Sequence, residues 1–236
     1  MIIKTKAPLR ISFAGGGTDI EAFSKRYGGV VLNATIDLNS YCIFESNNEK
    51  KVVFKSLDYN LKWTSPAKSH FKLDGTLDLH KAIYNKMVYL YNNGRPLSLK
   101  VTSFSDAPPG SGLGSSSSLV VAIIKAYEKF LKIKLSKRKI AELSYSIERE
   151  DCSIDGGAQD QYAASFGGFN FMEFLRNGKV TVNSMNLKKE TINNLESHLI
   201  LYFTGISRKS KKIIHQQKYF INKKNTNTIN ALKKIK

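Results

Sequence analysis

Apolar residues alternate or recur at regular spacing along most of the chain, and these patterns predict a mixture of strands and helices. Leu9, Ile11 and Phe13 alternate with polar residues, as on a strand with one buried face. Similar runs predict strands at residues 2–5, 30–36, 40–45, 51–56, 97–104, 168–174, 179–185 and 199–204. Helical spacing predicts helices at residues 19–27, 80–91 and 119–131, from residue 136, and around residue 160. Residues 57–77 are less regular, and residues 187–195 suit a polar connector or a short helix.

The segment between the predicted strand at 97–104 and the helix from Leu119 has the composition of an anion-binding loop. Residues 108–118 read Pro-Pro-Gly-Ser-Gly-Leu-Gly-Ser-Ser-Ser-Ser. Glycine lets the backbone approach a ligand closely. The first N–H groups of the following helix lack intrahelical acceptors and lie at the positive end of its dipole. The loop lacks the lysine of a Walker A loop, and a flexible linker or a plain helix cap is the alternative interpretation.

Three acidic positions are candidates for chemistry. Asp19 follows three glycines, next to a strand that carries Arg10, which suits a polyol site or, as the alternative, a tight turn with a surface ion pair. Asp160 lies in the first turn of a short helix, where the dipole favours a carboxylate that could act as a general base or only cap the helix. Glu148 and Glu150 lie on opposite flanks of a helix end, so spacing cannot choose between them.

The net charge of +18 raises the possibility of nucleic-acid binding. Residues 207–236 hold ten Lys or Arg and no acid, so much of the excess is local, and Tyr219 and Phe220 are their only aromatic residues. A basic RNA-binding module is therefore the alternative class. Cys42 and Cys152 lack metal-ligand spacing, no apolar run approaches the roughly 20 residues of a membrane span, and the N-terminus lacks a signal-peptide core. We expect a cytoplasmic protein without a membrane partner.

Several of these segments resemble the motifs of the GHMP kinases, which include galactokinase, homoserine kinase and mevalonate kinase. Residues 108–117 resemble the family's phosphate loop, Pro-x-x-x-Gly-Leu-Gly-Ser-Ser. Residues 7–19 fit the pattern Ala-Pro-x-Arg-x-x-x-x-Gly-x-x-Thr-Asp of its sugar kinases, and residues 157–161 resemble its Gly-x-x-Asp-Gln segment. Galactokinases have Glu-His before Thr-Asp, where this chain has Gly16 and Gly17. That form is similar to kinases that phosphorylate D-glycero-D-manno-heptose 7-phosphate at the anomeric carbon.

The resemblance implies an ATP- and Mg²⁺-dependent sugar-1-kinase and assigns a role to each motif. It implies that Asp160 is the catalytic base and that Arg10 orients the reacting groups. It selects Glu148, twelve positions before Asp160, as a Mg²⁺ ligand with Ser116, and leaves Arg149 and Glu150 as a solvated helix end. The implied sugar-phosphate site is formed by Gly16, Gly17, Thr18 and Asp19. The implied ATP site is formed by Pro108, Pro109, Gly110, Ser111, Gly112, Leu113, Gly114, Ser115, Ser116 and Ser117. A kinase for a neutral sugar (fucose, an N-acetylhexosamine or galactose) and an inactive nucleotide-binding fragment are alternatives.

The resemblance also implies a fold and a domain organisation. The implied fold class is α+β, a two-layer α/β arrangement, with a GHMP N-terminal domain of ribosomal-protein-like fold over residues 1–195. Residues 196–236 would begin a ferredoxin-like second domain, since residues 204–208, Thr-Gly-Ile-Ser-Arg, resemble its start, where a helix follows. The family's third glycine-rich motif is absent from the sequence, so we expect the chain to be incomplete.

Overall fold

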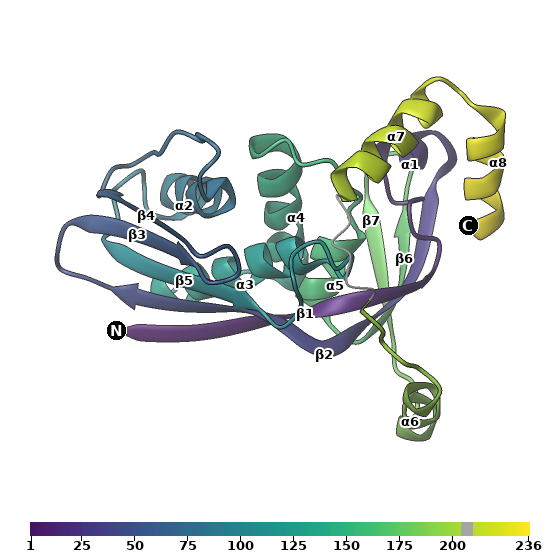
Figure 1. Cartoon of the computed structure of the whole chain (residues 1–236), viewed down its shortest axis with the longest axis horizontal. Coiled ribbons are helices and arrows are strands. Elements are labelled where there is room, and N and C mark those ends of the chain that lie inside the picture. Colours follow the sequence, from purple (N-terminus) through teal and green to yellow (C-terminus); the bar gives the residue numbers. More distant parts are fainter. Residues whose placement is uncertain (204–209) are drawn as a thin grey trace.

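The computed structural model describes residues 1–203 and 210–236, and it consists of one sheet with most of its helices packed on one face (Figure 1). The strands are β1 (Ile2–Ala14), β2 (Gly29–Ser46), β3 (Lys51–Ser56), β4 (Leu61–Pro66), β5 (Leu99–Ser105), β6 (Phe169–Phe174) and β7 (Val180–Met185). The helices are α1 (Glu21–Tyr27), α2 (Asp78–Tyr91), α3 (Ser115–Phe130), α4 (Lys137–Ser146), α5 (Gln159–Phe166), α6 (Lys189–Ser197), α7 (Ser210–Asn222) and α8 (Thr226–Ile235). A π-helical turn, Ile147–Asp151, extends α4. This confirms the predicted two-layer α+β class.

The long strand β2 joins the two halves of the seven-stranded sheet. Its residues 40–46 pair with β5 and its residues 29–34 pair with β6, while β1 pairs along residues 32–45. The resulting order is β4-β3-β5-β2-β6-β7, with β1 attached to β2. Among these strands of the described residues, β3 and β5 are the one parallel pair. Because β1 and β2 run the length of the sheet, residues of β1 reach from the core to the motif loops.

Helix α3 forms the centre of the core between the sheet and the other helices. Almost all of its apolar residues are buried. Its Tyr127 packs edge-on against Phe44 of β2, with ring centroids 5.0 Å apart, and Phe44 also contacts Phe130. An aromatic pair of this kind adds about 0.5–1.5 kcal/mol to the burial of its surface. At the other end of α3, the first turn carries the serines of the predicted phosphate loop, and Ser118 Oγ anchors it to the carbonyl of Pro8 in β1 at 2.7 Å.

The strands differ from the predicted ones where pairing partners outweigh the local pattern. Residues 2–14 form one strand with register shifts near Pro8 and near Ser12, because β2 supplies a partner on both sides of each shift. Residues 29–46 are likewise one strand. The strand β4 lies in the segment that has no regular sequence pattern. Within the described residues it pairs with β3 alone, and its side chains alternate between exposed and half-buried, which gives little apolar alternation.

The predicted strand over residues 199–204 is wrong for residues 199–203, which form no strand. Their large side chains are exposed, with Ile200 at 92% and Tyr202 at 81%. A strand needs the backbone of a neighbour for its N–H and C=O groups, and the sheet of the described residues offers none here. Residues 204–208 of the predicted second-domain motif lie outside the described residues. Residues 189–197 form α6, so the predicted domain boundary after residue 195, which stays a prediction, falls inside a helix.

Helices α7 and α8 fold back onto α1 (Figure 1). Phe23 of α1 is fully buried together with Ile221 and Leu232, which form a small second core. Arg26 donates to the carbonyl of Ile221 at 3.0 Å. The basic end of the chain is therefore packed beside the glycine turn that precedes α1. None of the helices in the described parts of the chain combines the length and apolar character needed to cross a bilayer.

Candidate active site

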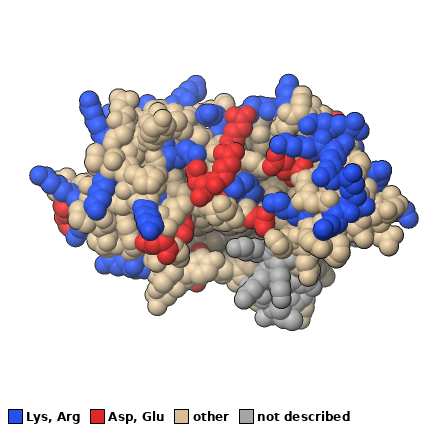
Figure 2. Space-filling model, turned by 90° about the horizontal axis from the view of Figure 1, so that it is seen from above, with Lys and Arg blue, Asp and Glu red and all other residues tan. Residues whose placement is uncertain are grey.

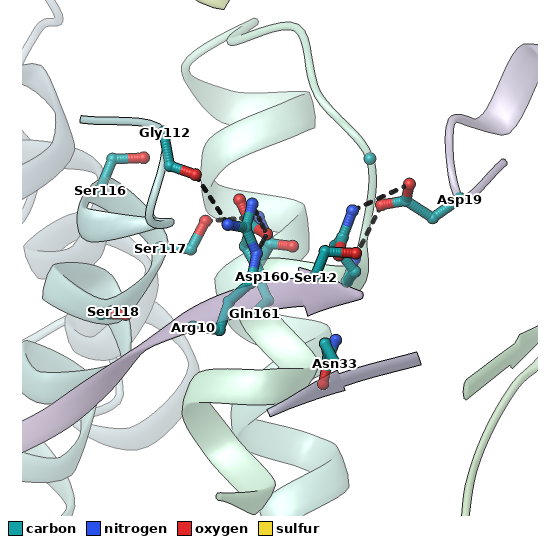
Figure 3. A network of polar contacts seen from close by, with 12 residues as sticks. Arg10, Ser12, Asp19, Asn33, Gly112, Ser116, Ser117, Ser118, Asp160 and Gln161 are labelled. Carbon is teal, nitrogen blue, oxygen red and sulfur yellow. Dashed lines mark hydrogen bonds and ion pairs between the residues drawn. The ribbon is translucent and has the colours of Figure 1, made fainter. Parts of the chain in front are cut away.

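Arg10 of β1 connects three segments that are distant in the sequence (Figure 3). Its Nε donates to Oδ1 of Asp160 at 2.7 Å, and its Nη2 forms an ion pair with the same oxygen at 2.6 Å. Its Nη1 donates to the carbonyl of Gly112 at 2.7 Å, and its backbone N–H donates to the carbonyl of Leu113 at 3.1 Å. Both side chains of the ion pair are mostly shielded, with 14% and 22% exposed. The arginine therefore holds the predicted phosphate loop next to the predicted base.

The glycine-rich loop ends at the N-terminus of α3, directly above Asp160. Gly114 precedes the helix with a φ of +76°, a left-handed conformation that glycine adopts most readily. A Cβ on Gly114 would lie 3.2 Å from Cγ of Asp160, so a side chain there would press on the carboxylate. The N–H groups of the first turn of α3 lack intrahelical acceptors. The loop thus presents backbone donors beside a carboxylate and a guanidinium.

Glu148 lies behind the first turn of α3 and is fully buried. Ser116 Oγ donates to its Oε1 at 2.7 Å, and Ser117 Oγ donates to its Oε2 at 2.6 Å. Gln161 Nε2 donates to Oε2 at 2.5 Å and to Ser117 Oγ at 3.0 Å. Glu150 is exposed, and the one hydrogen bond it accepts within the described residues comes from Ser146. The structure thereby places Glu148, and not Glu150, next to the phosphate loop.

Carboxylate and hydroxyl oxygens of this kind are suitable ligands for Mg²⁺. The described residues contain no cluster of three or more His, Cys, Asp or Glu side chains. Mg²⁺ is usually bound by one or two carboxylates together with phosphate oxygens and water, so such a cluster is not required. The carboxylate of Glu148 and the hydroxyl of Ser116 therefore fit an ion that binds together with a nucleotide.

Asp19 lies across the cavity from the glycine loop and is held by backbone and side-chain donors. Its carboxylate accepts from Gly17 N–H at 3.0 Å, from Gln159 N–H at 3.0 Å and from Gln159 Nε2 at 3.3 Å. Burial raises the pKa of Asp19, the backbone hydrogen bond from Gln159 opposes this, and the charge of Asp160 adds to it. A Cβ on Gly157 would lie 1.9 Å from Oδ2 of Asp19. Only glycine allows the loop before α5 to pack this closely on the acid.

Thr18 and Arg149 shape the loops on either side of Asp19. The buried hydroxyl of Thr18 donates to the carbonyls of Gly15 and Val30 at 2.7 and 2.8 Å. The sequence analysis predicted that Arg149 lies in solvent at a helix end, and this prediction is wrong. Its side chain is 12% exposed and donates to the carbonyls of Gly157 and Ile154 at 2.8 and 3.2 Å. The turn Ile147–Asp151 directs Arg149 inward, so that it holds the loop that contacts Asp19.

A cavity of about 880 Å³ brings the motifs together. The predicted residues that line it are Arg10, Gly16, Gly17, Asp19, Gly110, Gly112, Leu113, Gly114, Ser115, Ser116, Ser117 and Asp160. The predicted residues that do not line it are Pro108, Pro109, Ser111, Thr18 and Glu148. Lining residues that the sequence analysis missed include Ser12, Tyr59, Arg149, Gln159, Ile214 and Gln217. Ser12 and Gln159 adjoin recognised motifs and could have been found there, whereas Tyr59 and the two residues of α7 carry no local signal.

The fold and the three motifs around one cavity are those of the GHMP kinase family, and the chain belongs to this family. The family model for the GHMP kinases N terminal domain matches residues 78–168. The D-glycero-alpha-D-manno-heptose 7-phosphate kinase of Campylobacter jejuni is 47% identical over 216 residues, which cover 92% of this chain and 63% of that enzyme. The chain thus spans less than two thirds of the length of this curated relative.

Two solved structures resemble the chain closely. A D-glycero-D-manno-heptose 1-phosphate kinase from Bacteroides thetaiotaomicron matches with a TM-score of 0.83 and 39% identity, covering 98% of this chain and 76% of the other. A putative sugar kinase from Campylobacter jejuni matches with a TM-score of 0.79 and 42% identity, covering 98% of this chain and 73% of the other. These similarities extend over nearly the whole chain.

Proposed function

We propose that the chain catalyses transfer of the γ-phosphoryl group of ATP to the anomeric hydroxyl of D-glycero-D-manno-heptose 7-phosphate. The observation that carries this proposal is the Arg10–Asp160 pair, which lies in one cavity between the glycine loop and Asp19. Such a cavity can hold a nucleotide phosphate and a sugar hydroxyl next to each other, with the Asp160 carboxylate beside the hydroxyl. The similarity to the Campylobacter jejuni heptose 7-phosphate kinase supports the choice of sugar.

In this proposal the glycine loop binds the phosphates of ATP. The unpaired N–H groups at the start of α3 donate to phosphate oxygens, and the helix dipole favours their negative charge. Ser116 and Glu148 would hold Mg²⁺, which neutralises charge on the β- and γ-phosphates when it is bound. Gln161 and Ser117 keep the Glu148 carboxylate in one orientation. Phosphoryl transfer depends mainly on such positioning and charge neutralisation.

Asp160 acts as the general base in the proposed reaction. The contacts of Arg10 with the Asp160 carboxylate are made to Oδ1, which leaves Oδ2 to accept the proton of the anomeric hydroxyl. The sugar oxygen then forms a bond to the γ-phosphorus as the bond to the bridging β–γ oxygen breaks, and ADP leaves. Arg10 keeps the carboxylate in place and adds positive charge beside the transferring group. Gly16, Gly17 and Asp19 would contact the sugar, while Thr18 keeps the turn in shape.

The variant Asp160→Asn tests this function. We expect kcat with ATP, Mg²⁺ and the heptose 7-phosphate to fall by on the order of 10²–10⁴, the usual contribution of a general base. The KM for ATP should change little, because Asp160 does not belong to the phosphate loop. Asp151→Asn is the matched control, since Asp151 forms an ion pair with Lys86 outside this cavity. Unchanged turnover in Asp160→Asn would remove Asp160 from the mechanism.

A further inference from the structure

A second hollow of about 530 Å³ continues from the candidate active site. It lies between α1, the turn Ile147–Asp151, the loop before α5 and α7. No residue of the glycine loop lines it. The residues that line both spaces are Ile20, Arg149, Ile154, Asp155, Gly156 and Ile214. The second hollow is therefore an extension of the first cavity, away from the site of the ATP phosphates.

Positive charge predominates in this extension. Four cationic side chains line it, against the two carboxylates Glu21 and Asp155, and the cations are Lys25, Arg26, Arg149 and Lys218. Figure 2 shows Lys and Arg side chains gathered on the side of the molecule that carries α1, α7 and α8. A doubly charged anion would balance this excess, whereas a neutral part of a sugar would leave it uncompensated.

The two lysines are the cations that can turn toward a ligand. Lys25 of α1 is 58% exposed, and its one ion pair among the described residues is with Glu21, which is 56% exposed. Lys218 of α7 is 49% exposed and donates to Asp155 at 3.0 Å. Arg26 and Arg149 instead donate to backbone carbonyls, so they add a fixed positive field. Lysine binds phosphate as a mobile point charge, and a phosphate dianion is a stronger partner than one carboxylate.

The geometry points to this extension, which we name the distal pocket, as the binding site for the terminal phosphate of the sugar substrate. Lys25 of α1 and Lys218 of α7 bind the phosphate, and Arg26 and Arg149 contribute charge. The inference rests on the proposed function, because only a sugar phosphate whose anomeric carbon lies at Asp160 would extend toward this pocket. According to this inference, residues of α1 and α7 make the protein prefer a phosphorylated sugar to a neutral one.

Calorimetric binding and turnover with two sugars test the assignment. The sugars are D-glycero-D-manno-heptose 7-phosphate and the same heptose without phosphate. The proteins are the wild type, the double variant Lys25→Gln/Lys218→Gln, and the control Lys223→Gln, which removes a charge just after α7 and outside the pocket. We expect the wild type and the control to bind the phosphorylated sugar at least tenfold more tightly. The double variant should lose most of this preference, with unchanged KM for ATP and unchanged affinity for the neutral heptose.

The outcomes separate this inference from the proposed function. Lys218→Arg, which keeps the positive charge, should retain much of the preference that Lys218→Gln loses, which a role in merely holding α7 would not explain. If the wild-type protein binds both sugars equally tightly, the assignment of the distal pocket as the phosphate site is wrong, whatever the turnover. A double variant that keeps the preference, or that weakens binding of both sugars alike, would also overturn it. Tight, lysine-dependent binding without phosphoryl transfer would support the pocket and count against the proposed function alone.

Discussion

Arg10 and Asp160 illustrate what the sequence can and cannot predict for single residues. Motif resemblance identified both side chains, and the structure places them 2.6 Å apart. The contact between Gly157 and Asp19 was not predictable, because a glycine in a turn gives no information about which side chain lies against it. Burial of Arg149 was missed for a related reason: a charged residue near a helix end usually lies in solvent, and its carbonyl partners are set by the tertiary fold.

At the residue scale, we predict that Gly157→Ala disrupts the position of Asp19. The new methyl group would lie 1.9 Å from Oδ2 of Asp19, so the acid or the loop must move. We expect a loss of about 1–3 kcal/mol in the free energy of unfolding, typical of overpacking, together with a higher KM for the sugar. Urea denaturation and steady-state kinetics measure the two effects.

Gly16→Ala is the matched control for that substitution. A Cβ on Gly16 has its nearest neighbour at an ordinary distance, 3.5 Å from Oγ of Ser12. The unfolding midpoint of Gly16→Ala should stay close to that of the wild type. Equal stability of the two variants would show that the loop tolerates a methyl group beside Asp19.

At the scale of elements, the turn Ile147–Asp151 decides which glutamate faces the phosphate loop. Spacing on a regular helix cannot separate Glu148 from Glu150. In the structure the N–H of Cys152 donates to the carbonyl of Ile147, five residues earlier, which widens the helix at this point. Glu148 is thereby buried between α3 and α5, and Glu150 remains at the surface. A π-helical turn has no simple sequence signature, so only the family pattern could select Glu148.

We predict that Glu148→Gln raises the Mg²⁺ concentration needed for half-maximal turnover, by tenfold or more on the basis of typical ligand losses. Ser116→Ala should act in the same direction and more weakly, since a neutral hydroxyl contributes less than a carboxylate. Titration of activity with Mg²⁺ at saturating ATP measures both. Glu150→Gln, two positions along the same turn, should leave the titration unchanged. If all three variants titrate like the wild type, Glu148 and Ser116 are not metal ligands.

The strands show the same division between local pattern and tertiary partner. Apolar alternation identified most strand positions, but not that β1 and β2 each continue through a break in the pattern. Their continuity comes from pairing with each other. The predicted strand at residues 199–204 shows the converse, because an apolar run without a neighbouring strand stays irregular over residues 199–203. Local pattern gives strand tendency, and the rest of the sheet decides whether a strand forms.

At the scale of the whole molecule, the fold gathers motifs near residues 10–19, 108–118 and 148–161 around one cavity. The family resemblance of the three motifs, which occur in the expected order along the chain, was sufficient to predict that they form one site. The placement of α7 was not predictable, although Ile214 and Gln217 line the same cavity. Nor could the total charge show that Lys218 lies beside an extension of the active site. Both depend on how α7 and α8 pack against α1.

The most direct test of the account is ADP release from ATP and Mg²⁺ with D-glycero-D-manno-heptose 7-phosphate, measured beside galactose, fucose and mannose. The Asp160→Asn protein supplies the background rate. We predict turnover with the heptose phosphate that exceeds this background by at least a hundredfold, and rates near background with the three neutral sugars. Turnover with a neutral sugar alone, or background rates with all four, would contradict the proposed function.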